Sequence, residues 1–343
     1  EMLFGAMDAL TLGDPWDLST DIGPVIDAEA RDAIAAHLAA AEREGRLAKR
    51  LAAPERGAFI GPSVVRIRGI EDLEEEIFGP VLHVATFEAD EIDAVVQAVN
   101  ARGYGLTFGM HSRIDDRVQQ VVESVRVGNL YVNRNQIGSI VGSQPFGGEG
   151  LSGTGPKAGG PRYVARLRAR PAGDAPSVEG RALATETVVA AFRALPPPSE
   201  ASLEEETMPG PTGESNRYRV VPRGRVLCLG PTPEAAAEQA ARARAAGCSA
   251  LACAPGISEG LDGVCPPEAL TALPDLAAVL FWGEAGRARA LRRALAAREG
   301  PLVPLVTESD PERWLVHERH VCIDTTAAGG NASLLAASAE AAA

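Results

Sequence analysis

The chain has 343 residues and is 45% hydrophobic, enough for a sizeable core in more than one domain and too apolar for a disordered tail. Its formal net charge of −13 argues against non-specific binding to nucleic acid. The apolar runs are too short for a transmembrane helix, and the odd number of cysteines without a C-x-x-C pair fits reduced thiols, so we expect a cytoplasmic protein, with peripheral membrane association of a longer protein left open.

Helix and strand patterns alternate through the first part of the chain. In chain order they predict the end of a helix at 1–10, a helix at 27–44, strands at 57–67 and 81–87, helices from 90 and around 118–125, and a strand at 129–133. Asp27 and Asp90 are the expected N-caps of the first and second full helices. In the helices after Asp90 and around Val118, apolar residues recur at i, i+3, i+4 and i+7. The alternation predicts an α/β domain with a largely parallel sheet.

The composition changes between residues 171 and 214, where prolines and three consecutive glutamates predict a linker with a short helix at 185–194. A second α/β unit follows. Its predicted strands are 226–229, 250–254, 278–282 and 302–307, and its helices begin at Thr232, with Pro233 in the first position, and at 284. The first turn lacks G-x-G-x-x-G, which gives little support for a dinucleotide site there. We therefore divide the chain into 1–170, 171–214 and 215–343.

A loop at 137–148 contains four glycines and one proline. Glycine lets a backbone approach a ligand closely, and neighbouring N–H groups in such a loop converge on an anion. We expect Gly138 and Ser139 to donate backbone N–H groups to the carboxylate of an amino-acid-like substrate, with the Ser139 hydroxyl as a third donor. Phe146 would lie along the aliphatic part of that substrate. The alternative is a tight surface loop that binds nothing.

The five cysteines all follow residue 225 and form no C-x-x-C pair. Because their number is odd and their spacing is irregular, we expect reduced thiols and neither a disulfide framework nor a metal site. The five histidines show no ligand spacing, and we expect them to be surface or core residues.

Several strings, in this order and spacing, resemble the aldehyde dehydrogenase superfamily over roughly residues 1–165. They are Gly13-Asp14-Pro15, Glu75-Glu76-Ile77-Phe78-Gly79-Pro80-Val81, Tyr104-Gly105-Leu106, Gly128-Asn129-Leu130-Tyr131-Val132-Asn133 and Pro145-Phe146-Gly147-Gly148. Residues 137–148 and 151–161 resemble the branch that oxidises L-glutamate γ-semialdehyde, formed from Δ1-pyrroline-5-carboxylate, to L-glutamate. Residues 210–216 and 325–334 resemble the C-terminal part of the bacterial, bifunctional proline utilization A family, in which an FAD-dependent proline dehydrogenase is joined to that enzyme.

The resemblance implies an α/β fold: the C-terminal half of an aldehyde dehydrogenase catalytic domain followed by a small Rossmann-like α/β domain. It implies that Glu76 accepts hydrogen bonds from the nicotinamide ribose of NAD and that Phe78 lies beside the nicotinamide. Gly138 and Ser139 match the family's aldehyde anchor, and Phe146 matches the ring on the substrate chain. From the residues alone, Glu76 also fits a solvated face, Phe78 an ordinary core position, and Phe146 a staple of its loop. The choice between NAD and NADP stays open, and FAD is expected only in a proline dehydrogenase domain outside this chain.

The family's reaction needs a cysteine thiolate that attacks the aldehyde. None of the five cysteines stands in the matching context, so we expect no catalytic residue here, a nucleophile upstream of Glu1, and an inactive isolated chain. Residues 215–343 are expected to form a non-catalytic cover over the semialdehyde site, with disorder after Leu335, and the subunits to pair into a homo-oligomer. The alternative is a non-catalytic binding or assembly fragment that keeps the loop at 137–148 without the chemistry.

Overall fold

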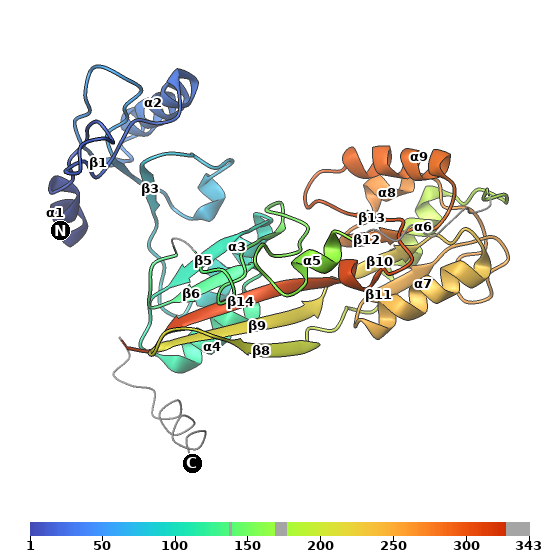
Figure 1. Ribbon diagram of the computed structural model, residues 1–343. Coiled ribbons are helices and arrows are strands. Elements are labelled where there is room, and N and C mark those ends of the chain that lie inside the picture. Colours follow the sequence, from blue (N-terminus) through green and yellow to red (C-terminus); the bar gives the residue numbers. More distant parts are fainter. Residues whose placement is uncertain (137–138, 169–176, 327–343) are drawn as a thin grey trace, which may run out of the picture. The chain divides into compact units, whose positions relative to one another are not determined.

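A computed structural model describes residues 1–136, 139–168 and 177–326 (Figure 1). The chain forms two compact units, Glu1–Arg102 and Gly103–Ala343. Gly138 and the chain end after Leu335, for which we made predictions, lie outside the described residues. Of the helices in the described ranges, none has the length and apolar character needed to cross a membrane.

The unit Glu1–Arg102 contains a three-stranded sheet in the order β1-β2-β3, with β1 antiparallel and β3 parallel to β2. Its elements are α1 (Met2–Asp8), α2 (Ala28–Arg43), β1 (Leu47–Arg50), β2 (Ser63–Arg66), the 3-10 turn η1 (Ile70–Asp72), β3 (Val81–Val84) and α3 (Ile92–Ala101). Asp27 caps α2 as predicted, because its Oδ1 accepts a hydrogen bond of 2.8 Å from the Ala30 N–H. Ile34 and Leu38 of α2 then pack with Val65 of β2 in a buried cluster.

The cap that we expected at Asp90 is wrong. Helix α3 begins one residue later than that cap requires, with Glu91 in the N-cap position and no side-chain capping bond. The predicted apolar spacing nevertheless holds, because Val96 of α3 is buried and Ile92, Val95 and Val99 are partly buried.

The unit Gly103–Ala343 contains a five-stranded sheet in the order β5-β6-β14-β9-β8. The strands are β5 (Thr107–Met110), β6 (Asn129–Val132), β8 (Glu204–Met208), β9 (Glu214–Pro222) and β14 (Val316–Asp324). Strand β14, drawn in red in Figure 1, lies between β6, to which it is parallel, and β9, to which it is antiparallel over nine residue pairs. The sequence patterns predicted none of β8, β9 and β14, and β8 falls within the predicted linker. Through this sheet, residues after 204 lie directly beside the strand that precedes the loop at 137–148.

A second sheet, parallel throughout, has the order β11-β10-β12-β13. Its elements are β10 (Arg225–Cys228), α7 (Pro233–Ala245), β11 (Ser249–Ala252), α8 (Ala269–Ala272), β12 (Leu276–Leu280), α9 (Ala285–Ala296) and β13 (Leu305–Val306). Alanines of α7 pack in one buried cluster with this sheet, and residues of α8, α9 and α6 (Thr185–Arg193) pack in another. Thr232 caps α7 by accepting a hydrogen bond of 3.3 Å from the Ala235 N–H. The predicted Rossmann-like α/β character of this region is confirmed.

The remaining described elements are β4 (Tyr104–Gly105), α4 (Asp115–Ser124), β7 (Glu149–Gly150), α5 (Tyr163–Arg166) and η2 (Glu312–Trp314). In α4, Val118, Val121 and Val122 are buried, as their spacing predicts. The division into 1–170, 171–214 and 215–343 stays a prediction. Strands from the first and last of these segments share the five-stranded sheet.

Candidate functional site

The loop predicted to hold the substrate begins at the carboxyl end of β6. Asn133, the residue after β6, adopts φ = 59°, a left-handed conformation that asparagine tolerates better than most residues. Its Oδ1 accepts a hydrogen bond of 2.9 Å from the Ser112 N–H, and its Nδ2 donates one of 2.9 Å to the Ser112 carbonyl. Asn133 therefore ends the strand and directs the chain into the loop. In α/β sheets, ligands bind outside the carboxyl ends of the strands.

The described part of this loop, residues 139–148, is called the anchor loop below. Ser139 is exposed, and so are Ile140 (51%) and Val141 (84%). The Gln144 N–H donates to the Ile140 carbonyl at 2.7 Å, which closes a turn between them. The outer half of the anchor loop thus presents Ser139 to solvent, and its inner half enters the protein at Gln144, which is buried.

Phe146, on the inner half, is partly buried and has its backbone fixed by a two-way pairing with Ala158. The Phe146 N–H donates to the Ala158 carbonyl at 3.0 Å, and the Ala158 N–H donates to the Phe146 carbonyl at 2.7 Å. Phe146 is neither fully exposed nor enclosed in a core. Partial burial of the residue is compatible with a role beside a substrate.

Both neighbours of Phe146 are held by buried polar side chains. Asn129 of β6 donates its Nδ2 to the Pro145 carbonyl at 2.9 Å, and its Oδ1 accepts from the Gly147 N–H at 3.2 Å. Lys157 donates its Nζ to the same Oδ1 at 2.7 Å and to the Gly147 carbonyl at 2.7 Å. Neither side chain was predicted as a site residue from the sequence. Asn129 and Lys157 stand within family strings, but their contacts depend on the tertiary fold.

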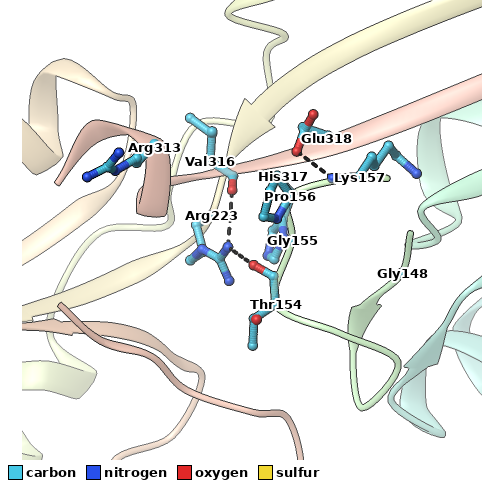
Figure 2. Close-up of a pocket in the computed structure, with 10 residues that line it drawn as sticks. All are labelled: Gly148, Thr154, Gly155, Pro156, Lys157, Arg223, Arg313, Val316, His317 and Glu318. Carbon is cyan, nitrogen blue, oxygen red and sulfur yellow. Dashed lines mark hydrogen bonds between the residues drawn. The ribbon is translucent and has the colours of Figure 1, made fainter. Parts of the chain in front are cut away.

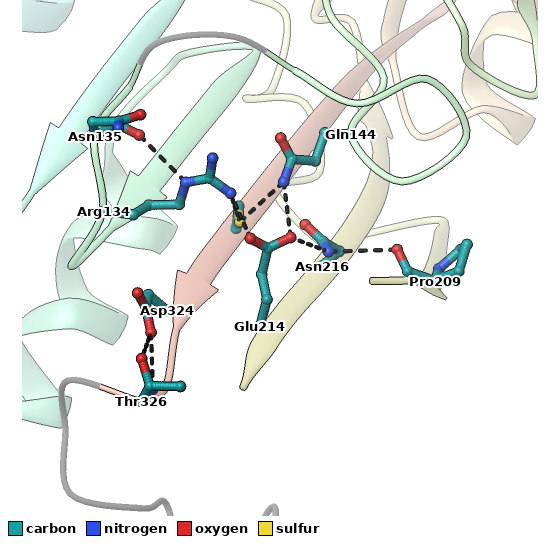
Figure 3. Close-up of polar contacts among 9 residues, drawn as sticks. Arg134, Asn135, Gln144, Pro209, Glu214, Asn216, Asp324 and Thr326 are labelled. Carbon is teal, nitrogen blue, oxygen red and sulfur yellow. Dashed lines mark hydrogen bonds and ion pairs between the residues drawn. The ribbon is translucent and has the colours of Figure 1, made fainter. Parts of the chain in front are cut away.

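A second polar cluster connects Arg134, before the loop, and Gln144, within the loop, to Glu214 of β9 (Figure 3). Glu214 forms an ion pair of 2.6 Å with Arg134 and accepts hydrogen bonds of 2.9 Å from both Gln144 and Asn216. Arg134 also donates to the sulfur of Cys322 on β14 at 3.2 Å. Glu214 therefore connects Arg134, which precedes the loop, with Gln144, which lies within it.

A polar pocket lies next to Lys157 (Figure 2). Its lining residues are Gly148, Thr154, Gly155, Pro156, Lys157, Arg223, Arg313, Val316, His317 and Glu318. Arg223 donates to the Thr154 carbonyl at 2.6 Å and to the Val316 carbonyl at 3.3 Å. Burial lowers the pKa of Arg223 to about 10 and that of His317 to about 3, so His317 is neutral near pH 7. None of the predicted site residues lines this pocket.

The two residues predicted to bind the cofactor lie in the unit Glu1–Arg102, between η1 and β3. Both are exposed, Phe78 to the extent of 82%. Phe78 is therefore not a core residue of its unit, which excludes the alternative that it occupies an ordinary core position. An exposed carboxylate at Glu76 fits both a solvated face and an acceptor for ribose hydroxyls. Ser139 and Phe146 belong to the other unit.

All five cysteines lie in the described part of the chain, and all are buried and unpaired. Cys322 accepts a hydrogen bond from Arg134, but this contact does not make its thiol a nucleophile. Burial raises the pKa of that thiol to about 11. A buried, protonated thiol is a poor nucleophile. Within the described residues, no group of three or more His, Cys, Asp or Glu side chains is arranged to hold a metal ion.

Comparison with known proteins agrees with this architecture. The model of the aldehyde dehydrogenase family matches residues 1–168, so this segment is part of an aldehyde dehydrogenase domain. Over 98% of its length the chain is 38% identical to the bifunctional protein PutA of Escherichia coli (strain K12), of which it spans 29%.

Two further relatives match this chain, one over less than half of its length and the other, a solved structure, over nearly all of it. Over 46% of its length, the chain is 42% identical to a 1-pyrroline-5-carboxylate dehydrogenase of Bacillus thuringiensis (strain Al Hakam), of which it spans 30%. The structure of proline utilization A from Corynebacterium freiburgense matches 96% of this chain, and 34% of that chain, with a TM-score of 0.63. Its sequence identity is 24%, so that structure supports the fold alone. The chain spans about a third or less of each of these relatives.

Proposed function

We propose that this chain forms the substrate-anchoring part of an NAD-dependent enzyme that oxidises L-glutamate γ-semialdehyde to L-glutamate in proline catabolism. The observation that carries the proposal is the anchor loop. It follows β6 in the sequence, Glu214 holds Arg134 before it and Gln144 within it, and Asn129 and Lys157 fix the backbone around Phe146. The similarity to proteins named PutA and 1-pyrroline-5-carboxylate dehydrogenase points to the same substrate.

The substrate suits such a loop because its two ends differ chemically. One end carries an α-carboxylate and an α-ammonium group, and the other carries the reactive aldehyde. The N–H groups of Gly138 and Ser139, with the Ser139 hydroxyl, bind the carboxylate in this proposal, and Phe146 packs on the methylene groups between the two ends. Fixing one end of a flexible substrate places its other end for reaction.

Glu76 and Phe78 are the residues of this chain that we propose for the cofactor. The exposed carboxylate of Glu76 can accept hydrogen bonds from the two ribose hydroxyls, and the exposed ring of Phe78 offers an apolar surface to the nicotinamide. When bound, NAD supplies the hydride acceptor of the oxidation. FAD belongs in this proposal to a proline dehydrogenase domain outside the chain.

The nucleophile is proposed to come from residues outside this chain, because its own five thiols are buried. The isolated chain is then inactive, and the active protein is longer and cytoplasmic, with paired subunits. The same burial of the thiols favours a second candidate function, a binding or assembly fragment that holds a zwitterion without oxidising it. NADH formation separates the two candidates.

The decisive assay measures semialdehyde-dependent NADH formation by the isolated chain and by the longer polypeptide that carries it. We expect turnover only from the longer protein. In that protein, Phe146→Ala should raise KM for the semialdehyde by about tenfold or more, since burying an aromatic ring on aliphatic groups contributes about 1.5–3 kcal/mol. KM for NAD should not change. Leu302→Ala, which removes an apolar side chain that is 58% exposed, is the matched control and should change neither value. Turnover by the isolated chain would refute the placement of the nucleophile, and inactivity of the longer protein would favour the binding fragment.

A further inference from the structure

Lys157 is the most unusual charged residue near the anchor loop. Its side chain is among the largest fully buried ones, with the residue 2% exposed. Its ammonium contacts two neutral oxygens, Asn129 Oδ1 and the Gly147 carbonyl. In the described part of the chain, no carboxylate forms an ion pair with this ammonium. Glu318, which lies nearby, accepts a hydrogen bond from the backbone N–H of Lys157 and not from its side chain. A buried ammonium is costly when it is not paired with an opposite charge, so this position calls for an explanation beyond stability.

Both oxygens that Lys157 contacts belong to groups that fix the backbone around Phe146. The Gly147 carbonyl belongs to the residue after Phe146. The Asn129 amide contacts the residues on both sides, Pro145 through its Nδ2 and Gly147 through its Oδ1. Phe146 itself pairs with Ala158, the neighbour of Lys157 in the sequence. The backbone from residue 145 to residue 147 is therefore fixed at its carbonyl and N–H groups by one network.

We propose that Lys157 is a positioning residue for the semialdehyde: it locks the Gly147 carbonyl and the Asn129 amide, and thereby fixes the Phe146 ring against the aliphatic part of the substrate. This inference rests on the function proposed above. It assigns Lys157 no contact with the substrate or the cofactor. Its effect on the reaction passes through Phe146.

The charged and titratable groups around Lys157 are consistent with a role that does not require its charge. Glu149 of β7 and Glu318 and Arg319 of β14 act on it electrostatically, and so does the buried ring of His320. Burial lowers the pKa of Lys157 to about 7. A neutral amine still has two N–H donors, which is the number of bonds that its nitrogen makes here. The two hydrogen bonds of the Lys157 nitrogen therefore persist whether the side chain is protonated or neutral.

The test compares Lys157→Met with the unchanged residue in the complete enzyme that carries this chain. Methionine has nearly the same length and is apolar, so it fills the same space without a donor. We expect KM for the semialdehyde to rise about tenfold, because small displacements of a positioned group cost that much or more. KM for NAD and the unfolding temperature should stay close to their original values, since the substitution also removes a buried charge. Should Lys157→Met unfold at the assay temperature, Lys157→Gln, which keeps an N–H donor on a shorter side chain, is measured in the same way and should show the smaller rise.

A double-mutant cycle with Phe146→Ala distinguishes positioning from general weakening. If Lys157 acts through Phe146, the double variant will have the same KM for the semialdehyde as Phe146→Ala alone. Multiplication of the two effects, or an unchanged KM in Lys157→Met, would overturn the inference while the proposed function stands. An original enzyme that forms no NADH from the semialdehyde would overturn both.

Discussion

The buried ion pair between Glu149 and Arg319 offers a quantitative test of how the loop region is joined to β14. Glu149 lies in β7, directly after the anchor loop, and Arg319 lies in β14. Two hydrogen bonds connect them, of 3.0 Å from Nε to Oε2 and of 2.8 Å from Nη2 to Oε1. The Glu149 side chain is 9% exposed and that of Arg319 is 22% exposed. The substitution Glu149→Gln keeps the size of the side chain and removes its charge.

The magnitude follows from the pKa of Glu149. Burial, the largest single effect, acts to raise this pKa, but the Arg319 guanidinium together with His317 and Lys157 outweighs burial, and the pKa falls from 4.5 to about 2. A shift of this size corresponds to about 3 kcal/mol, at about 1.4 kcal/mol per pKa unit. Because the pKa is lower in the folded state, this stability is fully present above pH 4.5 and is lost as the pH falls toward 2. Breaking one side of a buried ion pair costs about 3–5 kcal/mol, which agrees.

Urea unfolding followed by the fluorescence of Trp282 and Trp314 reports on the unit that contains the pair. We expect Glu149→Gln to lower the free energy of unfolding at pH 7 by about 3 kcal/mol. The matched control is Glu312→Gln. Glu312 also makes two contacts with an arginine, Arg242, at 2.5 and 2.9 Å, but its side chain is 52% exposed. Such a pair contributes about 1 kcal/mol or less. Equal losses in the two variants would refute the reasoning from burial.

Three further predictions concern other parts of the account. A Cβ atom at Gly128 would stand 1.8 Å from the Gly147 carbonyl oxygen, so Gly128→Ala should cost about 2 kcal/mol or more of folding free energy, visible as a lower unfolding temperature; an unchanged temperature would contradict this contact. In the complete enzyme, Glu76→Gln should raise KM for NAD about tenfold and leave KM for the semialdehyde unchanged, because hydrogen bonds to a charged group contribute about 1.5–3 kcal/mol; the reverse pattern would move Glu76 to the substrate. None of the five cysteines should react with a chromogenic disulfide reagent before unfolding, and all should react in urea, whereas rapid labelling of a folded thiol would show that it is accessible.

Sequence patterns predicted the elements that depend on residues close together in the sequence, such as helices with a regular apolar spacing and an N-cap. The apolar spacing in α3 and α4 was sufficient for both helices, and Asp27 and Thr232 cap their helices as expected. The Asp90 cap failed because a capping residue type is common and its geometry depends on where the helix starts.

Strands β9 and β14 could not be predicted in this way, since both carry many polar and charged residues among their apolar ones. These two strands pair with each other across about a hundred residues of sequence, and contacts such as Arg319 with Glu149 satisfy their charges. The same reason explains what was missed at the candidate site. Glycine content and family strings point to the anchor loop, but the contacts of Lys157 with Asn129 and of Glu214 with Arg134 and Gln144 depend on the tertiary fold.

The measurement that tests the central claim most directly is a crystal structure of the complete enzyme soaked with L-glutamate, the product of the proposed reaction. The account predicts that the α-carboxylate lies within hydrogen-bonding distance of the N–H groups of Gly138 and Ser139, with the methylene groups against Phe146. Glutamate bound at another position, with these N–H groups unoccupied, would contradict it.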